Sequence, residues 1–218
     1  PVKAQHKQPV LAKTSSPDYN NSVFINCPFD AAYSSTLRAL IFTIYRCGFF
    51  PLTALAEDNG LENRLSKIEK LIEQCRYGIH DISRIEISNI GLPRFNMPFE
   101  LGIFFGAKHF GNKKQKEKNA LIFDSELFRY QQFISDLNGV DIKAHQNNPQ
   151  LAIKKVTEWL HSSSKRSSIP GYKIITTEYA AFEKGLPALS VKLGIDENDF
   201  PFNNFCLIVE EAIKGKVA

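Results

Sequence analysis

Short apolar runs alternate with helical patterns along most of this 218-residue chain, and this alternation limits its fold more than any other feature. Runs with strand character fall at residues 22–26, 49–56, 76–82, 120–123 and 140–142. Apolar residues at helical spacing fill the segments 31–47, 61–75, 98–110 and 151–160. Such alternation is typical of a parallel sheet. We therefore expect an α/β fold: a flavodoxin-like, doubly wound open parallel sheet of about five strands, with helices on both faces.

One glycine and one proline add detail to this prediction. Gly48 is expected to end the helix at 31–47, because glycine readily adopts the left-handed conformation that follows many helices. Pro51 lacks an N–H group, which suggests that the strand at 49–56 lies at an edge of the sheet.

The composition changes at both ends of the chain. Residues 1–21 are polar and show little periodicity, so we expect a flexible lead-in before the α/β domain at 22–162. A serine-rich run then opens a linker and helical C-terminal extension at 163–218, with helical patterns near 177–193 and 204–214. The extension is too short for a core of its own, so we expect it to pack on the main domain or on a partner.

Composition also limits the partners and the compartment. No stretch reaches the roughly 20 apolar residues that span a bilayer, and the N-terminal residues lack the apolar core of a signal peptide. The four cysteines lie among apolar residues and at no zinc-ligand spacing, so we expect no metal site and a reducing, cytoplasmic location. The net charge is +4, and the basic run at 113–118 contains no aromatic residue, so we expect a solvated loop rather than a nucleic-acid site.

The candidate site residues follow from the expected sheet. In an open parallel sheet, ligands bind at the carboxyl ends of the strands, near the point where the strand order reverses. The candidates at these ends are Cys27, Phe29, Asp30, Asp81, Ser83, Arg84, Asn96, Phe99, Glu100 and Asp124. We interpret Glu57-Asp58, after the second strand, as a turn. No glycine-rich phosphate loop follows the first strand, which argues against an ordinary dinucleotide or NTP site.

Glu100 is the most informative of these carboxylates. Pro98 suits the first position of a helix and disfavours helical geometry at Met97, so we expect Met97 at the N-cap and Glu100 as the third helical residue. The helix dipole and the free N–H groups would stabilise the ionised carboxylate there. Such a glutamate can attack, or stabilise, a developing cation at a sugar anomeric carbon. The alternative is a helix cap, although the capping box lacks its serine or threonine.

Three segments occur in an informative order between about residues 22 and 125. The first is Val23-Phe24-Ile25-Asn26-Cys27-Pro28-Phe29-Asp30, followed by Tyr33 and a helix. The second is a helix and a strand that lead into Asp81-Ile82-Ser83, and the third is Asn96-Met97-Pro98-Phe99-Glu100-Leu101-Gly102. The third segment resembles an Asn-x-x-x-Glu-Leu-Gly element. Together the three resemble the nucleoside 2-deoxyribosyltransferase-like and TIR-like families.

The resemblance implies an N-glycosidase that needs no cofactor and acts on a nucleoside, a nucleotide or NAD, by hydrolysis or base exchange. Glu100 would be the nucleophile or would stabilise the oxocarbenium ion, and Asp81 would orient the substrate. Phe29 and Asp30 would wall the pocket and approach the ribose hydroxyls, and Asn96 would help to orient the substrate. Such domains often act as toxic effectors in prokaryotic antiviral defence. We also expect a homo-oligomer.

Two other functions stay open. The same pocket could bind a nucleotide signal without cleaving it, or the chain could be a TIR-like assembly domain. The segment 84–95 is an insert relative to the resembled families, and it would shape or cover the pocket. Within it Arg84 could bind a phosphate, with Arg64, Arg94 and Arg129 as rivals.

Other polar residues are expected to have structural roles. His80 precedes Asp81 in a strand, so their side chains point to opposite faces, and we interpret His80 as structural. We expect His145 to be exposed in a polar loop. Ser83 and Ser125 have no evident histidine or lysine base, which argues against serine catalysis.

Overall fold

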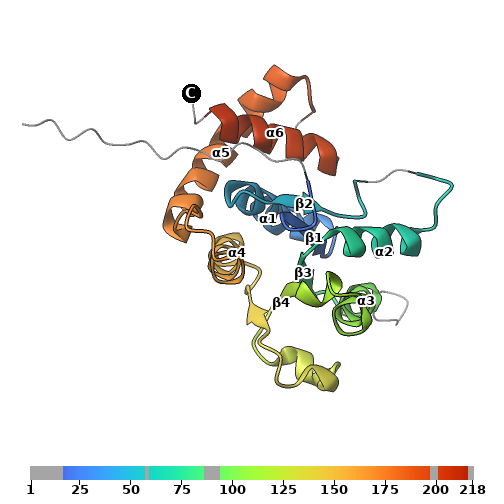
Figure 1. Ribbon diagram of the computed structural model, residues 1–218. Helices are drawn as coiled ribbons and strands as arrows, with labels where there is room; N and C mark the ends of the chain where they lie inside the picture. The colour runs from blue at the N-terminus through green and yellow to red at the C-terminus, as the bar shows by residue number, and fades with distance from the viewer. Residues whose placement is uncertain (1–16, 57–58, 86–93, 197–200, 216–218) are drawn as a thin grey trace, which may run out of the picture.

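The computed structural model describes residues 17–56, 59–85, 94–196 and 201–215. Within these residues, five parallel strands form one sheet with the order β2-β1-β3-β4-β5 (Figure 1). The strands are β1 (Ser22–Asn26), β2 (Phe50–Leu52), β3 (Tyr77–Asp81), β4 (Asn119–Asp124) and β5 (Lys143–Ala144). Strand order, parallel pairing and helices on both faces confirm the flavodoxin-like, doubly wound fold.

The strand order reverses between β1 and β3. From β1 the chain passes outward to β2, and the next strand, β3, pairs with β1 on its other side. Asn26 at the end of β1 lies opposite His80, and Asp81 at the end of β3 lies opposite Phe123 of β4. The carboxyl ends of β1 and β3 therefore meet at the point where this architecture binds its ligands.

One face of the sheet is covered by two layers of helices. Helices α1 (Ser34–Arg46) and α4 (Pro149–Ser164) pack against each other on this face, and α5 (Tyr172–Leu193) and α6 (Phe202–Gly215) pack onto them (Figure 1). Phe182 of α5 links the layers, with ring centroids 5.1 Å from Phe42 of α1 and 5.9 Å from Phe205 of α6. All four helices share one buried cluster with side chains of β1, β3 and β4, so the C-terminal helices belong to the core of the sheet.

Helices α2 (Arg64–Gln74) and α3 (Asn96–Phe110) cover the opposite face. Buried Lys118 anchors the end of α2, because its Nζ donates to the carbonyl oxygens of Ile72 (2.5 Å) and Cys75. These carbonyls belong to the end of a helix, where the backbone lacks its own donors. Burial lowers the pKa of Lys118 to about 8.

Short 3₁₀ helices connect the main elements: η1 (Ala31–Tyr33), η2 (Gln115–Glu117), η3 (Arg129–Gln132) and η4 (Ser135–Leu137). The first of them begins with a capping bond, in which Asp30 Oδ1 accepts from the N–H of Tyr33 at 3.0 Å. This cap turns the chain directly after β1 and keeps Tyr33, which is buried, at the carboxyl edge of the sheet.

Some boundary predictions are confirmed and others are wrong. Gly48 has the expected left-handed backbone (φ +79°), and β2 with Pro51 lies at an edge of the sheet. Helix α2 begins at Arg64, three residues late, because Asn63 caps it and Leu61 points fully into solvent. The strand expected at 140–142 is also wrong: β5 is formed by Lys143–Ala144, whose backbone pairs with the end of β4.

The lead-in is shorter than expected. Tyr19 is buried, its hydroxyl donates to the carbonyl of Lys114 at 2.5 Å, and its carbonyl accepts from the N–H of Arg76 at 2.9 Å. Residues from Tyr19 onward are therefore fixed to the sheet, and residues 1–16 lie outside the described part. Of the helices in the described ranges, none is long and apolar enough to cross a membrane.

Candidate functional site

Asp81 lies at the centre of a buried polar cluster at the carboxyl edge. Its Oδ2 accepts from the hydroxyl of Tyr33 at 2.5 Å and lies 2.9 Å from Nε2 of His145. Its Oδ1 accepts from the backbone N–H of Ser83 at 2.8 Å. All four residues are at most 2% exposed, so the carboxylate is surrounded by donors and shielded from water. Burial, followed by the nearby charge of Asp81, raises the pKa of Tyr33 far above its ordinary value, so the phenol remains a donor.

The position of His145 corrects the expectation of an exposed loop residue. His145 directly follows β5, so it lies at the same edge of the sheet as Asp81, and its side chain is fully buried. Its Nδ1 accepts from the N–H of Asn147 at 2.9 Å, so a ring proton lies on Nε2, the nitrogen nearest Asp81. The error came from placing the fifth strand three residues too early, which moved His145 away from the strand end.

Asn26 connects the end of β1 to the first turn of α3. Its Nδ2 donates to the carbonyl oxygen of Met97 at 2.9 Å and to Nδ1 of His80 at 3.1 Å. His80 is buried between Phe24 and Phe104, and burial lowers its pKa to about 3, so the ring is neutral. Its geometry agrees with the expected structural role: His80 orients Asn26, and Asn26 fixes the start of the helix that carries the candidate nucleophile.

Gly78 lets α3 approach the sheet closely. A Cβ at this position would lie 2.7 Å from Nε2 of His80 and 2.8 Å from the ring of Phe104. Only a residue without a side chain fits between the strand and these two rings. The depth at which α3 packs, and therefore the position of Glu100, depends on this glycine.

Glu100 is buried, with 5% of its surface exposed, and no hydrogen bond or ion pair to its carboxylate occurs among the described residues. Helix α3 begins at Asn96, with Phe95 at the N-cap, so the prediction of Met97 as the N-cap is wrong. Pro98 fits inside the first turn because the N–H groups of that turn have no helical partner to lose. Glu100 is thus the fifth helical residue and caps nothing.

This position reverses the expected electrostatics of Glu100. The free N–H groups of the first turn do not stabilise its charge, and burial raises its pKa from 4.5 to about 7, against the opposing effect of Arg64. Burial therefore favours the protonated form of this carboxyl group more than in an ordinary glutamate. A shift of this size in a group without a partner is typical of a functional carboxylate.

Three carboxylates lie near the buried thiol of Cys27, at the end of β1. Burial is the main cause of its strongly raised pKa, and the charges of Asp81, Glu100 and Asp30 raise it further. All three carboxylates therefore lie within electrostatic range of one residue at the end of β1. Arg84 lies at the same edge, with Nη2 3.7 Å from Asp30 Oδ1. The structure thus gathers five of the candidate site residues at the switch point.

Asp124 is paired with Arg129 and not with the Asp81 cluster. Its Oδ1 accepts from Nε (2.8 Å) and Nη2 (2.5 Å) of Arg129, and Nη2 also donates to the carbonyl of Ser83 at 2.8 Å. This pairing joins the end of β4 to the segment that follows β3. Asp124 therefore orders the edge of the sheet, and Arg129 is committed to it.

The remaining candidates lie at the rim or carry unpaired atoms. Phe29 and Phe99 are 36% and 57% exposed, and Asn96 is exposed. Ser83 Oγ and Asn26 Oδ1 are buried and have no hydrogen-bond partner in the described part of the chain, so each can serve a ligand at this edge. Residues 86–93 of the insert and the Glu57-Asp58 pair lie outside the described residues.

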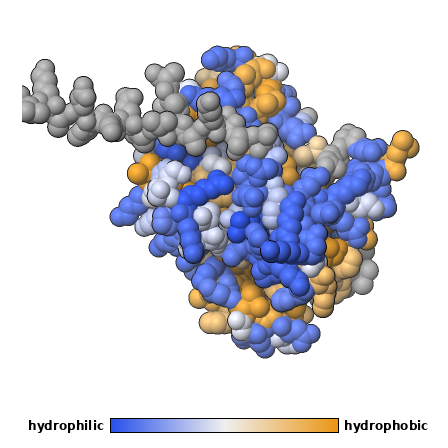
Figure 2. Space-filling model, in the orientation of Figure 1, coloured by the Kyte–Doolittle hydropathy of each residue, from blue (hydrophilic) through white to orange (hydrophobic). Residues whose placement is uncertain are grey.

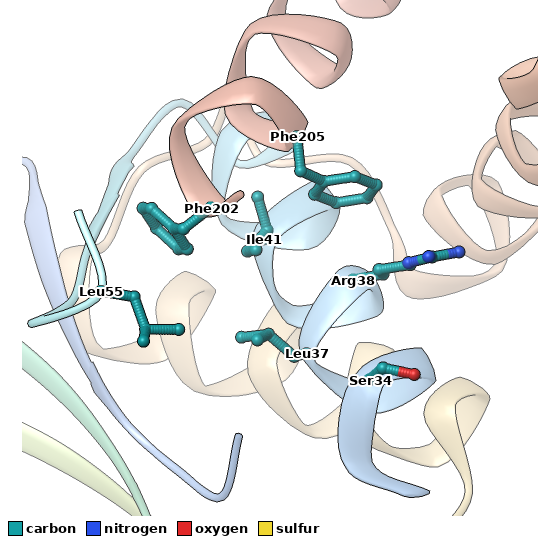
Figure 3. Close-up of a pocket in the computed structure, with 7 residues that line it drawn as sticks. All are labelled: Ser34, Leu37, Arg38, Ile41, Leu55, Phe202 and Phe205. Atoms are coloured by element: carbon teal, nitrogen blue, oxygen red, sulfur yellow. The ribbon is translucent and has the colours of Figure 1, made fainter. Parts of the chain in front are cut away.

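A separate cavity lies between α1 and the C-terminal helix α6 (Figure 3). It has a volume of about 140 Å³ and is lined mainly by apolar side chains of Leu37, Ile41, Leu55, Phe202 and Phe205, with Ser34 and Arg38 at its rim. It contains none of the predicted site residues. Over the described ranges, no group of three or more His, Cys, Asp or Glu residues is arranged to hold a metal ion.

Comparison of the chain with protein-family models, with curated proteins and with solved structures finds no match in any of the three. The function of the site is therefore inferred from its own geometry and chemistry. Sequence reasoning missed Tyr33, His145 and the role of Asn26. The available signal was position, because each of them ends or follows a strand at the carboxyl edge.

Proposed function

We propose that the chain is an N-glycosidase that cleaves the bond between base and ribose in a nucleoside, a nucleotide or NAD, with Glu100 as the reacting carboxylate. The observation that carries this proposal is a buried glutamate that has no partner among the described residues and is held at the β1/β3 switch point beside a second acidic centre. Burial raises its pKa to about 7. The sequence resemblance to deoxyribosyltransferase-like and TIR-like enzymes supports the same role.

In the proposed reaction, an ionised Glu100 oxygen attacks the sugar C1′ as the bond from C1′ to the base nitrogen breaks. The electron pair of that bond leaves with the base, and a water molecule then releases the sugar from the glycosyl ester. The burial of Glu100 increases the free energy of its charge, and bond formation at C1′ removes that charge. A raised pKa thus accompanies a reactive, poorly solvated nucleophile.

Asp81 acts in this proposal as a positioning residue. Its carboxylate is already engaged by Tyr33, His145 and the Ser83 backbone. It therefore fixes the edge of the sheet near Cys27, and the ribose hydroxyls are left to the unpaired Ser83 Oγ and to Asp30. This assignment differs from the direct substrate contact that the family resemblance implies for Asp81.

The test compares Glu100→Gln with the unaltered chain on NAD, nucleotides and deoxynucleosides, with released base measured by chromatography. Glu100→Gln keeps the shape of the side chain, and base release should fall by at least about 10³-fold. Glu69→Gln is the matched control, because Glu69 is an exposed residue of α2. Unchanged turnover in Glu100→Gln would refute the assignment of the nucleophile.

The second candidate is a module that binds a nucleotide in this pocket without cleaving it. The engagement of Asp81 by Tyr33, His145 and the Ser83 backbone favours it, because Asp81 is then not available to act on a ligand. Calorimetry with the same compounds separates the two functions. Binding heat without any released base would support the module.

A further inference from the structure

The outer face of α3 is apolar and open to solvent. Phe95, at the N-cap, and Phe99 and Phe110 within the helix are 66%, 57% and 91% exposed. The inner face of the same helix buries Leu101 and Phe104. Figure 2 shows apolar, orange residues at the lower right of the molecule, where α3 lies in Figure 1. A helix that is apolar around its circumference is typically covered on both sides.

Two glycines lie between these aromatic residues. At 100° per residue, positions 95, 99, 102, 106 and 110 fall within an arc of roughly 80° on the helix surface. No atom that would hinder a side chain lies within 4 Å of the Cβ position at Gly102 or at Gly106. Glycines spaced by four residues let two helices approach more closely than the usual 8–10 Å between axes. The exposed stripe therefore has two positions without a side chain, Gly102 and Gly106, between exposed phenylalanines.

The stripe is complementary to itself. The glycine pair is at its centre, with Phe99 and Phe110 at nearly equal distances along the sequence on either side. In an antiparallel pair about a two-fold axis, Gly102 of each copy faces Gly106 of the other, and Phe99 of each faces Phe110 of the other. Antiparallel packing also places opposite ends of the helix dipoles together. A two-fold contact of this kind uses the same patch on both copies.

We propose that α3 is the dimer interface of this protein and that its occupant is a second copy of the chain. The three phenylalanine side chains together expose roughly 400 Å² per copy. Two copies would thus bury roughly 800 Å² through these side chains alone, about two thirds of the roughly 1,200 Å² at which specific interfaces begin. In the proposed dimer, the exposed residues Asn96, Gly102 and His109 of the same helix would add to this area.

The test measures molar mass by sedimentation equilibrium over about two decades of protein concentration, using the full chain. The unaltered chain, of 24.7 kDa, should reach twice that mass. Phe110→Glu should raise the dissociation constant of the dimer at least about tenfold, because it places a charge in the apolar contact. Val191→Glu is the matched control, since Val191 is 82% exposed on α5, and it should leave the mass unchanged.

A second variant separates the interface from an effect on folding. Gly106→Ala has space within its own chain and replaces glycine in a helix, so it should raise the thermal midpoint of the monomer. The same methyl group should weaken the dimer, because it occupies the space between the two helices in the proposed contact. A chain that stays monomeric at all concentrations would overturn the proposal, as would equal masses for Phe110→Glu and Val191→Glu.

Discussion

Asp81 and Glu100 lie at the same edge of the sheet, and both carboxyl groups are buried. Asp81 is contacted by the Tyr33 hydroxyl, the Ser83 N–H and the His145 ring. Glu100 has no such partner among the described residues, and its pKa rises to about 7. The first group is held by the fold, whereas the second costs the fold free energy. A buried carboxylate that the protein leaves unpaired is the stronger candidate for chemistry.

The largest expected effect is the loss of the Asp81 carboxylate. Asp81→Ala leaves the buried Tyr33 hydroxyl and the buried Ser83 N–H without their acceptor, so the free energy of unfolding should fall by about 3 kcal/mol. Urea denaturation measures this change. Asp141→Ala is the control: Asp141 pairs with Lys143 at the surface with 81% of its side chain exposed, so the variant should lose less than about 0.5 kcal/mol. Similar losses for both variants would remove the contrast between Asp81 and Glu100.

The next largest loss of stability is expected when one hydrogen-bond donor to Asp81, the Tyr33 hydroxyl, is removed. Tyr33→Phe keeps the ring but removes the hydroxyl that donates to Asp81, so the protein should lose about 2 kcal/mol of stability. Tyr172→Phe is the matched variant, because the ring of Tyr172, which lies 5.2 Å from Lys154 Nζ, stays in place. Equal thermal midpoints for the two variants would mean that the hydroxyl contributes nothing to the cluster.

Removing the Glu100 carboxylate should instead raise the free energy of unfolding at neutral pH. Its pKa is raised from 4.5 to about 7 on folding, so the folded state holds the proton more tightly and stability falls as pH rises between these values. Glu100→Gln removes that loss. Relative to the unaltered chain, the variant should therefore become progressively more stable as pH rises from 4.5 to 7. Unfolding followed across this range measures the gain, and a constant difference would contradict the raised pKa.

The smallest effect concerns the charge that opposes this shift. Arg64, the exposed first residue of α2, lowers the pKa of Glu100, so Arg64→Gln should move that pKa slightly upward. The effect is small because solvent and salt screen an exposed charge. An NMR titration of the Glu100 side-chain carboxyl carbon detects it. Lys155→Gln on α4, across the sheet, should leave the titration unchanged.

The positions of several candidate residues at the strand ends could be predicted from the sequence, whereas the environment of each side chain was harder to predict. Asp81, Ser83 and Asp124 lie at or just after strand ends because the alternation of strands and helices already marked those ends. His145 was missed because β5 has only two residues, which gives almost no pattern to detect. The stabilisation of Glu100 expected from the first helical turn was wrong because the helix begins two residues earlier than Pro98 indicates.

The sequence by itself determined the architecture. Periodicity, Gly48 and Pro51 are local features, and they suffice to order helices and strands and to place one strand at an edge. Only the tertiary structure decided the state of the two carboxylates. Tyr33 and Asp81 are 48 residues apart in sequence, and the burial of Glu100 depends on how closely α3 packs on Gly78. Whether a carboxylate is paired or left alone depends on such distant neighbours, because burial and hydrogen bonding arise only when separate segments meet.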